Sequence, residues 1–369
     1  MNQRILTHMT IDEAKEKQFR LVSAIAREFT GNQFLSQGDV GVVPDWGRPV
    51  QTTRVERVLA HMFGTEACTL VRGAGTGAIR SLLSVLLKPG SPLFIHTGPV
   101  YTTTEETFHM MGLMPRRVDY NDGEAVERAL KEDTECRLFF VQHSRQQPED
   151  SYDLKGLIEQ VRRLRPDLPI IVDDNYTVFK TPQIGVELGA SHSCFSGFKL
   201  LGPPGIGVVV GEEKAIKEIW RRNYSGGGQV QGFEAMELLR SMVLAPVAIA
   251  VQTEQVDILC EKLNQGEVPQ VEKAYITNSQ SKNVIVELKE PISPEVIAAS
   301  EKHGAAIHPV GAESRYEVLP MIYRVSGTFL KSRPELAKHG IRINPMRAGA
   351  ELTVEILRKA ITDVMKERT

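Results

Sequence analysis

The chain has 369 residues and a formal net charge of −2, and its charged (24%) and apolar (41%) fractions are those of an average globular protein. Because acidic and basic residues are mixed along the chain, the charge pattern argues against a dedicated nucleic-acid binder, which normally carries a basic stripe. The start shows no signal-peptide pattern, no apolar run reaches membrane-spanning length, and the four cysteines lack disulfide or metal-ligand spacing. We expect a cytoplasmic protein of two domains, or of one large domain with a smaller appendage, without a metal, nucleic-acid or membrane partner.

The first segment, residues 1–45, is predicted to hold a helix and an active-site loop. Residues 10–29 have the apolar spacing of an amphipathic helix, and Thr10 and Glu13 form a capping box at its start. The glycine-rich stretch 37–49 follows this helix.

The second segment, residues 46–250, is predicted to be a large α/β domain. Helical stretches at 77–88, 103–112 and 152–164 alternate with short apolar runs, which indicates buried parallel strands in a sheet covered by helices. A helix over 231–250 is expected to close this domain, with one longer helix into the next part as the alternative. The apolar runs are ACTLV, PLFIH, RLFFV, PIIVD and IGVVVG.

The last segment, residues 251–369, has a different pattern and is predicted to be a smaller α+β domain. Its strand-like stretches are NVIVEL (283–288), AIHPV (306–310), YRVS (323–326) and IRINP (341–345), and a helix with a regular apolar face ends the chain.

A glycine loop, Gly73 to Ala78, stands between a predicted strand and a predicted helix. Glycines let a backbone approach a ligand closely, and the amides at a helix N-terminus favour an anion such as phosphate. The loop also matches the dinucleotide pattern G-x-G-x-x-A, but the next strand ends in His96 and Thr97 without the required acid. A tight turn that binds nothing is the third interpretation.

Two aspartates, Asp173 and Asp174, directly follow the apolar run LPIIV. The carboxyl end of a parallel strand is where α/β sheets bind ligands, and a buried aspartate there can keep a pyridine nitrogen protonated. The alternative for either residue is a turn or a helix cap.

A single lysine, Lys199, ends the otherwise uncharged stretch 193–199. Burial lowers the pKa of a lysine and favours the neutral amine that forms a Schiff base, and Ser196 could hold a phosphate oxygen. The alternative is a solvated loop lysine. Since Asp174 and Lys199 are 25 residues apart on successive predicted strand ends, we interpret them as parts of one site.

Two further motifs lie closer to the end of the chain. A glycine cluster, 226–228, precedes Gln229, and Arg342 lies in IRINP. An arginine fork can bind a carboxylate through two hydrogen bonds, whereas the alternative for Arg342 is a surface ion pair.

Together, the five motifs resemble those of the fold-type I enzymes that depend on pyridoxal 5′-phosphate (PLP), the aspartate aminotransferase superfamily. The resemblance covers roughly residues 35–365 and is closest to the branch of cysteine desulfurases, threonine aldolases and cystathionine lyases. More narrowly, the sequence is similar to the YhfS-like bacterial PLP-dependent proteins. It implies an α/β fold of type I, with a mostly parallel, seven-stranded-type sheet in the large domain and a smaller α+β C-terminal domain.

The resemblance also implies roles for residues around the cofactor. The phosphate would be bound by Gly75, Thr76 and Gly77, and Tyr101 would stack on the pyridine ring. Gln147 falls where many members have an asparagine near the phenolic oxygen, with Gln146 or His143 as alternatives.

The remaining motifs complete the implied site. VDDNYTVFKTP resembles the family's V-D-N-T-F segment, which favours Asp174 over Asp173 as the partner of the pyridine nitrogen. SGFK resembles the family's Ser-x-x-Lys signature, with Ser196 on the phosphate and Lys199 in the internal aldimine. GGGQVQG resembles the segment through which a neighbouring subunit approaches the site, here with Gly227. Arg342 would bind the α-carboxylate of the substrate.

The predicted function is PLP-dependent chemistry at the Cα atom of an amino acid, with Lys199 as general base and acid. An aminotransferase-type transferase is the leading interpretation, and a carbon–carbon or carbon–sulfur lyase is the alternative. A non-catalytic protein of the same fold and a nicotinamide dehydrogenase are more distant alternatives. By analogy with the superfamily, we expect a homodimer with shared active sites.

Overall fold

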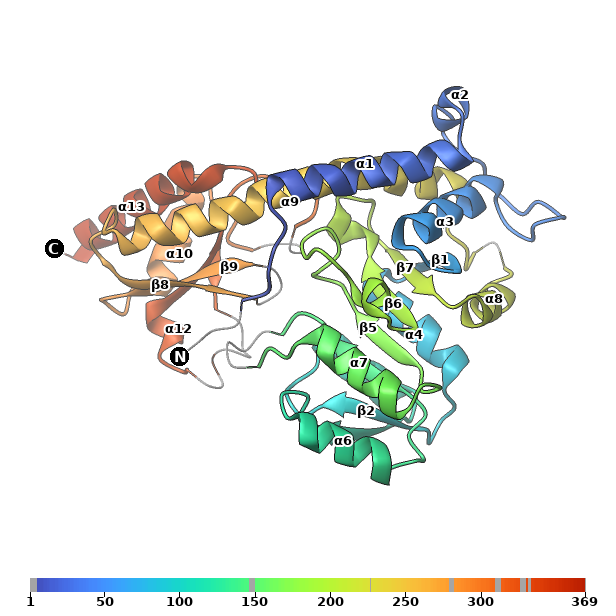
Figure 1. The fold of residues 1–369 in the computed structure, drawn as a ribbon. Helices are drawn as coiled ribbons and strands as arrows, with labels where there is room; N and C mark the ends of the chain where they lie inside the picture. The colour runs from blue at the N-terminus through green and yellow to red at the C-terminus, as the bar shows by residue number, and fades with distance from the viewer. Residues whose placement is uncertain are drawn as a thin grey trace. The chain divides into compact units, whose positions relative to one another are not determined.

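The computed structural model describes residues 5–145, 150–225, 227–278, 282–308, 313–325, 330 and 333–368. The chain divides into two compact units (Figure 1). The large unit comprises Glu13–His143 and Tyr152–Pro246. The small unit comprises Met1–Asp12, Ser144–Ser151 and Val247–Thr369.

A seven-stranded sheet forms the centre of the large unit, with the strand order β1-β7-β6-β5-β4-β2-β3. All five apolar runs expected to be strands are strands of this sheet. The strand β3, an edge strand with a largely exposed, basic sequence, was not predicted. The strand β6, whose end was expected just before Lys199, is buried but half polar. The strands are β1 (Ala67–Arg72), β2 (Pro92–His96), β3 (Met114–Val118), β4 (Phe139–Gln142), β5 (Ile170–Asp173), β6 (His192–Ser196) and β7 (Ile206–Gly211).

The strand β7 runs against its neighbours, which corrects the expectation that IGVVVG is parallel. It pairs antiparallel with both β6 and β1, whereas the other pairs of the sheet are parallel. The connection from β6 to β7 explains the direction, because residues 197–205 contain only the short 3₁₀ helix η2 (Gly197–Leu200). A parallel return requires a crossover of a dozen or more residues.

Helices cover both faces of this sheet (Figure 1). One buried cluster joins Ile171 and Cys194 to residues of α4 (Ala74–Leu86) and α8 (Glu213–Arg222). A second cluster joins Ile170 and Val172 to residues of α6 (Gly123–Glu132) and α7 (Leu154–Leu164). Successive residues of β5 therefore point to opposite faces, as a strand requires. The other elements of this unit are α1 (Ile11–Glu28), α2 (Gly31–Phe34), α3 (Val50–Phe63), α5 (Thr102–Met110) and η1 (Gly185–Leu188).

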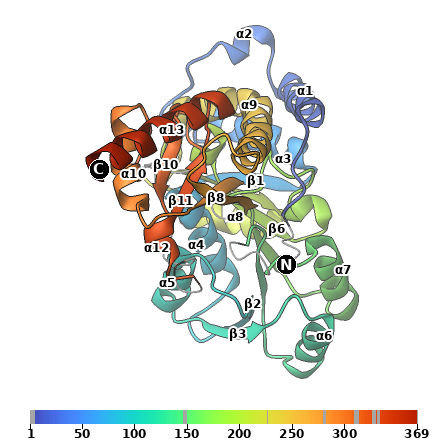
Figure 2. The same ribbon diagram turned by 90° about the vertical axis from the view of Figure 1, so that its left-hand side faces the viewer.

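The small unit has a four-stranded antiparallel sheet with the order β10-β11-β9-β8. Figure 2 shows α10 and α13 side by side along this sheet, and their apolar residues share one buried cluster with it. The expected strand 306–310 is reduced to a single bridge at Ala306, and its last two residues lie outside the described residues. The elements are β8 (Val271–Thr277), β9 (Asn283–Leu288), α10 (Ser293–Lys302), β10 (Met321–Arg324), α12 (Leu336–His339), β11 (Gly340–Asn344) and α13 (Gly349–Arg368).

A single 33-residue helix, α9 (Gly232–Asn264), passes from one unit into the other. The expected helix end at residue 250 was wrong, and the longer helix considered as the alternative is confirmed. The division between the units falls at Pro246, which lies inside this helix. Among the residues that the structure describes, no helix combines the length and apolar character needed to cross a lipid bilayer.

Candidate active site

The candidate site lies at one edge of the large-unit sheet. Strands β1 and β6 both run antiparallel to β7, so they are parallel to each other and to β5, and the three carboxyl ends share an edge. The register Asp173↔Cys194 places the residues after β5 beside those after β6. The prediction that Asp174 and Lys199 follow neighbouring strand ends is confirmed.

The glycine loop after β1 starts α4 at this edge. Gly73 and Ala74 both have positive φ angles, 92° and 54°, and both amides donate to the carbonyl of Gly205. A Cβ on Gly77 would lie 1.9 Å from the Arg72 carbonyl oxygen, so only glycine fits there. The amides of Gly75 and Thr76 lie in the first turn, where a helix offers no carbonyl to them, and an anion can accept their hydrogen bonds.

A side chain from the end of β5 packs against this first turn. A Cβ on Gly75 would lie 1.9 Å from Asn175 Oδ1, which shows how closely the Asn175 carboxamide approaches α4. The same carboxamide donates from Nδ2 to Asp173 Oδ1 at 2.6 Å, and the Asn175 amide donates to that oxygen at 3.1 Å. Asn175 therefore connects the glycine loop with Asp173.

Lys199 lies in η2, directly after β6, and its ammonium group faces an aromatic ring. The Nζ atom is 3.3 Å from the ring centroid of Tyr176, and Lys180 Nζ approaches the same ring at 5.2 Å. Ser196, buried at the end of β6, is the N-cap of η2. Tyr176 was not predicted as a site residue, although its place two residues after Asp174 was the available signal.

Tyr101 lies next to these residues, immediately before α5. Its amide donates to Gln142 Oε1 at 2.9 Å, and its side chain is partly exposed. The neighbouring Tyr176 and partial burial raise the pKa of Tyr101, while the positive charge of Lys199 opposes the shift. The phenol of Tyr101 therefore stays protonated at neutral pH. Thr103, two residues on, shares a 2.9 Å hydrogen bond with Thr76 and so joins α5 to the start of α4.

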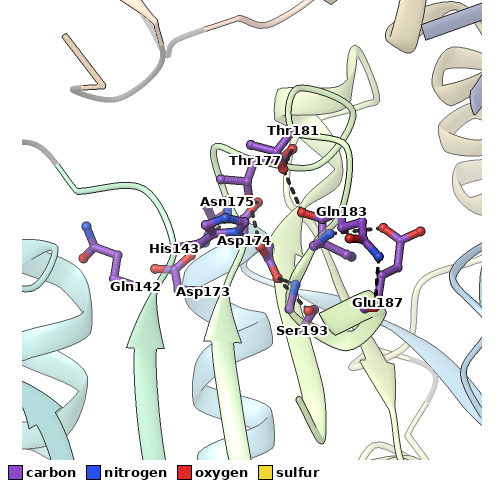
Figure 3. Close-up of polar contacts among 12 residues, drawn as sticks. Gln142, His143, Asp173, Asp174, Asn175, Thr177, Thr181, Gln183, Glu187 and Ser193 are labelled. Carbon is purple, nitrogen blue, oxygen red and sulfur yellow. Dashed lines mark hydrogen bonds and ion pairs between the residues drawn. The ribbon is translucent and has the colours of Figure 1, made fainter. Parts of the chain in front are cut away.

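Asp174 is the centre of a buried hydrogen-bond network (Figure 3). Its Oδ1 interacts with His143 Nδ1 and accepts from Thr177 Oγ1, both at 2.7 Å. Its Oδ2 accepts from Ser193 Oγ at 2.6 Å and from the Gly185 amide at 3.0 Å. Burial alone would raise the pKa of Asp174, but the bond and charge of His143 and the two hydroxyl groups lower it below its usual value. Asp174 is therefore a carboxylate at neutral pH.

Asp173 has a different environment. Burial raises the pKa of Asp173, although the hydrogen bonds from Asn175 and the positive charge of Lys199 favour its ionised form. The charge of Lys199 thus acts on the Asp173 carboxyl, which lies at the end of the neighbouring strand.

The remaining predicted residues lie elsewhere or cannot be placed. Gly227 is in the turn that precedes Gln229, and a Cβ there would meet nothing within 4 Å, so no close approach requires glycine. Arg342 is in β11 of the small unit, almost fully buried, with its guanidinium 5.7 Å from the Tyr323 ring centroid. Gln147, and its alternative Gln146, lie outside the described residues.

Comparisons with known proteins place this site in a family context. A model of the family described as Cys/Met metabolism PLP-dependent enzyme matches residues 46–287, and a model of the YhfS-like C-terminal domain matches residues 257–357. The protein YhfS of Escherichia coli (strain K12) is 47% identical over 359 residues, which are 97% of this chain and 99% of that protein.

Solved structures agree with these matches. The crystal structure of the PLP-dependent protein YhfS from Escherichia coli has a TM-score of 0.96 at 47% identity and covers 98% of this chain and 100% of its own. A cystathionine γ-lyase from Micromonospora echinospora has a TM-score of 0.73 at 16% identity, covering 94% and 98% of the two chains. A cystathionine γ-synthase from Xanthomonas oryzae pv. oryzae has a TM-score of 0.71 at 16% identity, covering 95% and 98%. The last two likenesses are evidence of fold alone, and together with YhfS they confirm the predicted fold class.

The contact between Gly75 and Asn175 leads to a test of the site's geometry. We expect Gly75→Ala to lower the free energy of unfolding of the cofactor-free protein by about 1–3 kcal/mol, because the new methyl group must displace the Asn175 carboxamide. In an Asn175→Ala background the same change should cost less than about 1 kcal/mol, since alanine suits a helix. Denaturation curves of the four proteins give the coupling energy. Equal costs in both backgrounds would contradict the described contact.

Proposed function

The chain belongs to the Cys/Met metabolism family of PLP-dependent enzymes, and we propose that it is a lyase that cleaves a side-chain bond of an amino acid. The observation that carries this proposal is the family match over residues 46–287, which includes Lys199, both aspartates and the glycine loop. An aminotransferase-type transferase, the leading expectation from the sequence, is not supported by these comparisons. The lyase alternative fits them better, and a carbon–sulfur bond is the one that we favour.

The residues at the sheet edge fit the cofactor chemically. The first-turn amides of Gly75 and Thr76, with the hydroxyl of Ser196, would hold the phosphate, since a helix N-terminus favours an anion. The Gly77 amide already donates to the Gly73 carbonyl at 2.8 Å, so its contact with the phosphate rests on the resemblance alone. Lys199 supplies the amine for the covalent link. When bound, PLP provides an electron sink that stabilises negative charge on the substrate Cα atom.

Proton transfer is the task of the protein's own side chains. The Lys199 amine would take the proton from the substrate Cα atom, and the Tyr176 ring, 3.3 Å from Nζ, would hold the amine at this edge of the sheet. Tyr101 would stack on the pyridine ring, and its protonated phenol is a donor for the departing side-chain group. Arg342 remains a prediction for the α-carboxylate of the substrate, based on the resemblance of IRINP.

We further propose a homodimer. One support is that the glycine-rich segment around Gly227 resembles the family segment through which a neighbouring subunit approaches the site. A second support is a row of exposed apolar side chains in the loop before α3, namely those of Leu35, Val40, Val42 and Trp46. Such exposed apolar groups are typical of a surface that another chain covers. Sedimentation equilibrium should give twice the chain mass of 41.0 kDa. A mass of one chain at micromolar concentration would contradict the dimer.

Covalent attachment to Lys199 can be tested directly. Borohydride should fix PLP to the protein irreversibly, and peptide mapping should place the adduct on Lys199. Lys180 is an internal control, because its amine approaches the same Tyr176 ring but should remain unmodified. The variant Lys199→Ala should give no adduct. An adduct on Lys180, or one that persists in Lys199→Ala, would refute the assignment.

The reaction type has its own test. A lyase that eliminates a thiol from an amino acid releases the thiol, ammonia and a keto acid after hydrolysis of the product enamine, so it needs no second substrate. We expect keto acid from sulfur-containing amino acids such as cystathionine without any added keto-acid acceptor. Lys199→Ala should lower kcat by about 10²–10⁴-fold, the usual contribution of a general acid–base group. Product that appears only after a keto acid is added would instead establish transamination.

A further inference from the structure

The two adjacent aspartates point to opposite faces of the large-unit sheet. Ile171 packs in the cluster that contains α4 residues, whereas Ile170 and Val172 pack in the cluster that contains α7 residues. Alternation along β5 then places Asp173 on the α4 face. The Asp174 amide continues the pairing by donating to the Cys194 carbonyl at 2.9 Å, and its side chain bonds Gly185 and Ser193 on the opposite face. Only the α4 face carries the glycine loop at its edge.

Asp174 has no room for another hydrogen bond. Four donors already occupy its two oxygens, and an ionised carboxylate has about four lone-pair sites. The helix η1 closes this side, since a Cβ on Gly185 would lie 2.4 Å from Val172 Cβ and 3.0 Å from Ser193 Oγ. With its side chain fully buried behind η1, Asp174 is oriented away from any ligand at the glycine loop.

Asp173 has the features that Asp174 lacks. Its Oδ1 accepts two hydrogen bonds from Asn175, while no described residue donates to its Oδ2. Asn175 packs against Gly75, which places Asp173 beside the first turn of α4. The carboxylate also interacts electrostatically with Lys199 and with Tyr101.

We propose that Asp173, rather than Asp174, is the carboxylate that pairs with the pyridine nitrogen of PLP. Asp174 is a positioning residue, whose network with His143, Thr177 and Ser193 fixes the chain directly after Asp173. The assignment rests on the proposed function only insofar as PLP binds at Lys199; it does not depend on the reaction type. It also differs from the choice of Asp174 that the sequence resemblance favoured.

The protonation of the pyridine nitrogen tests this assignment. Protein loaded with PLP labelled with ¹⁵N in the ring reports that state through its ¹⁵N chemical shift, without any substrate. In the wild type, the charge-assisted bond to a carboxylate should keep the nitrogen protonated. Asp173→Asn should move the shift to the unprotonated range and weaken PLP binding by about 10–100-fold, as loss of one such bond implies.

The matched control is Asp174→Asn. This change should lower the thermal midpoint of the cofactor-free protein more than Asp173→Asn does, because it disturbs four buried hydrogen bonds. The ¹⁵N shift of bound PLP, however, should stay in the protonated range. Ser193→Ala removes one donor of the same network and serves if Asp174→Asn does not fold; its ¹⁵N shift should also stay protonated.

The outcomes separate the two proposals. A ¹⁵N shift that moves in Asp174→Asn or in Ser193→Ala, or that does not move in Asp173→Asn, would overturn the assignment. Failure of the wild type to bind labelled PLP at Lys199 would refute the proposed cofactor site itself, and the shift comparison would then not arise.

Discussion

The register between β5 and β6 is the constraint on which the whole site depends. The pairing Asp173↔Cys194 brings the turn after β5 next to Lys199, and it also decides which aspartate faces which side. A slip by one residue would exchange every side chain of β5 between the faces. It would place Asp173 against η1 and turn Asp174 toward the glycine loop. Such a slip would also move the buried Ile170, Ile171 and Val172 out of the two close-packed clusters that hold them.

Two buried carboxylates side by side are costly unless each has compensating partners. The structure compensates Asp174 with donors from the protein, through His143 and the hydroxyls of Ser193 and Thr177. It compensates Asp173 less completely, through Asn175 and the charge of Lys199, so burial still raises the pKa of Asp173. An incompletely compensated group at a ligand-binding edge is typical of a functional site. A positively charged ring nitrogen would complete its environment.

The sequence predicted the strands that carry the site because their apolar runs are short, buried and bounded by turns. It also predicted Lys199 and Asp174 at neighbouring strand ends and the glycine loop after another strand, which fits the usual place of ligands at the carboxyl ends of α/β sheets. It could not predict the antiparallel direction of β7, or the edge strand β3, whose sequence is basic and largely exposed. The role of Tyr176 and the network of His143 arise from three-dimensional contacts between distant segments, for which a local pattern gives no signal.

A crystal structure of the PLP-loaded protein is the most direct test of the account. We expect continuous density between the cofactor and Lys199 Nζ, the phosphate against the amides of Gly75 and Thr76, and the pyridine nitrogen about 2.8 Å from Asp173 Oδ2. A cofactor whose nitrogen contacts Asp174 would contradict the assignment of the two aspartates. A phosphate bound away from α4, with Lys199 unmodified, would contradict the central claim that this edge of the sheet is the active site.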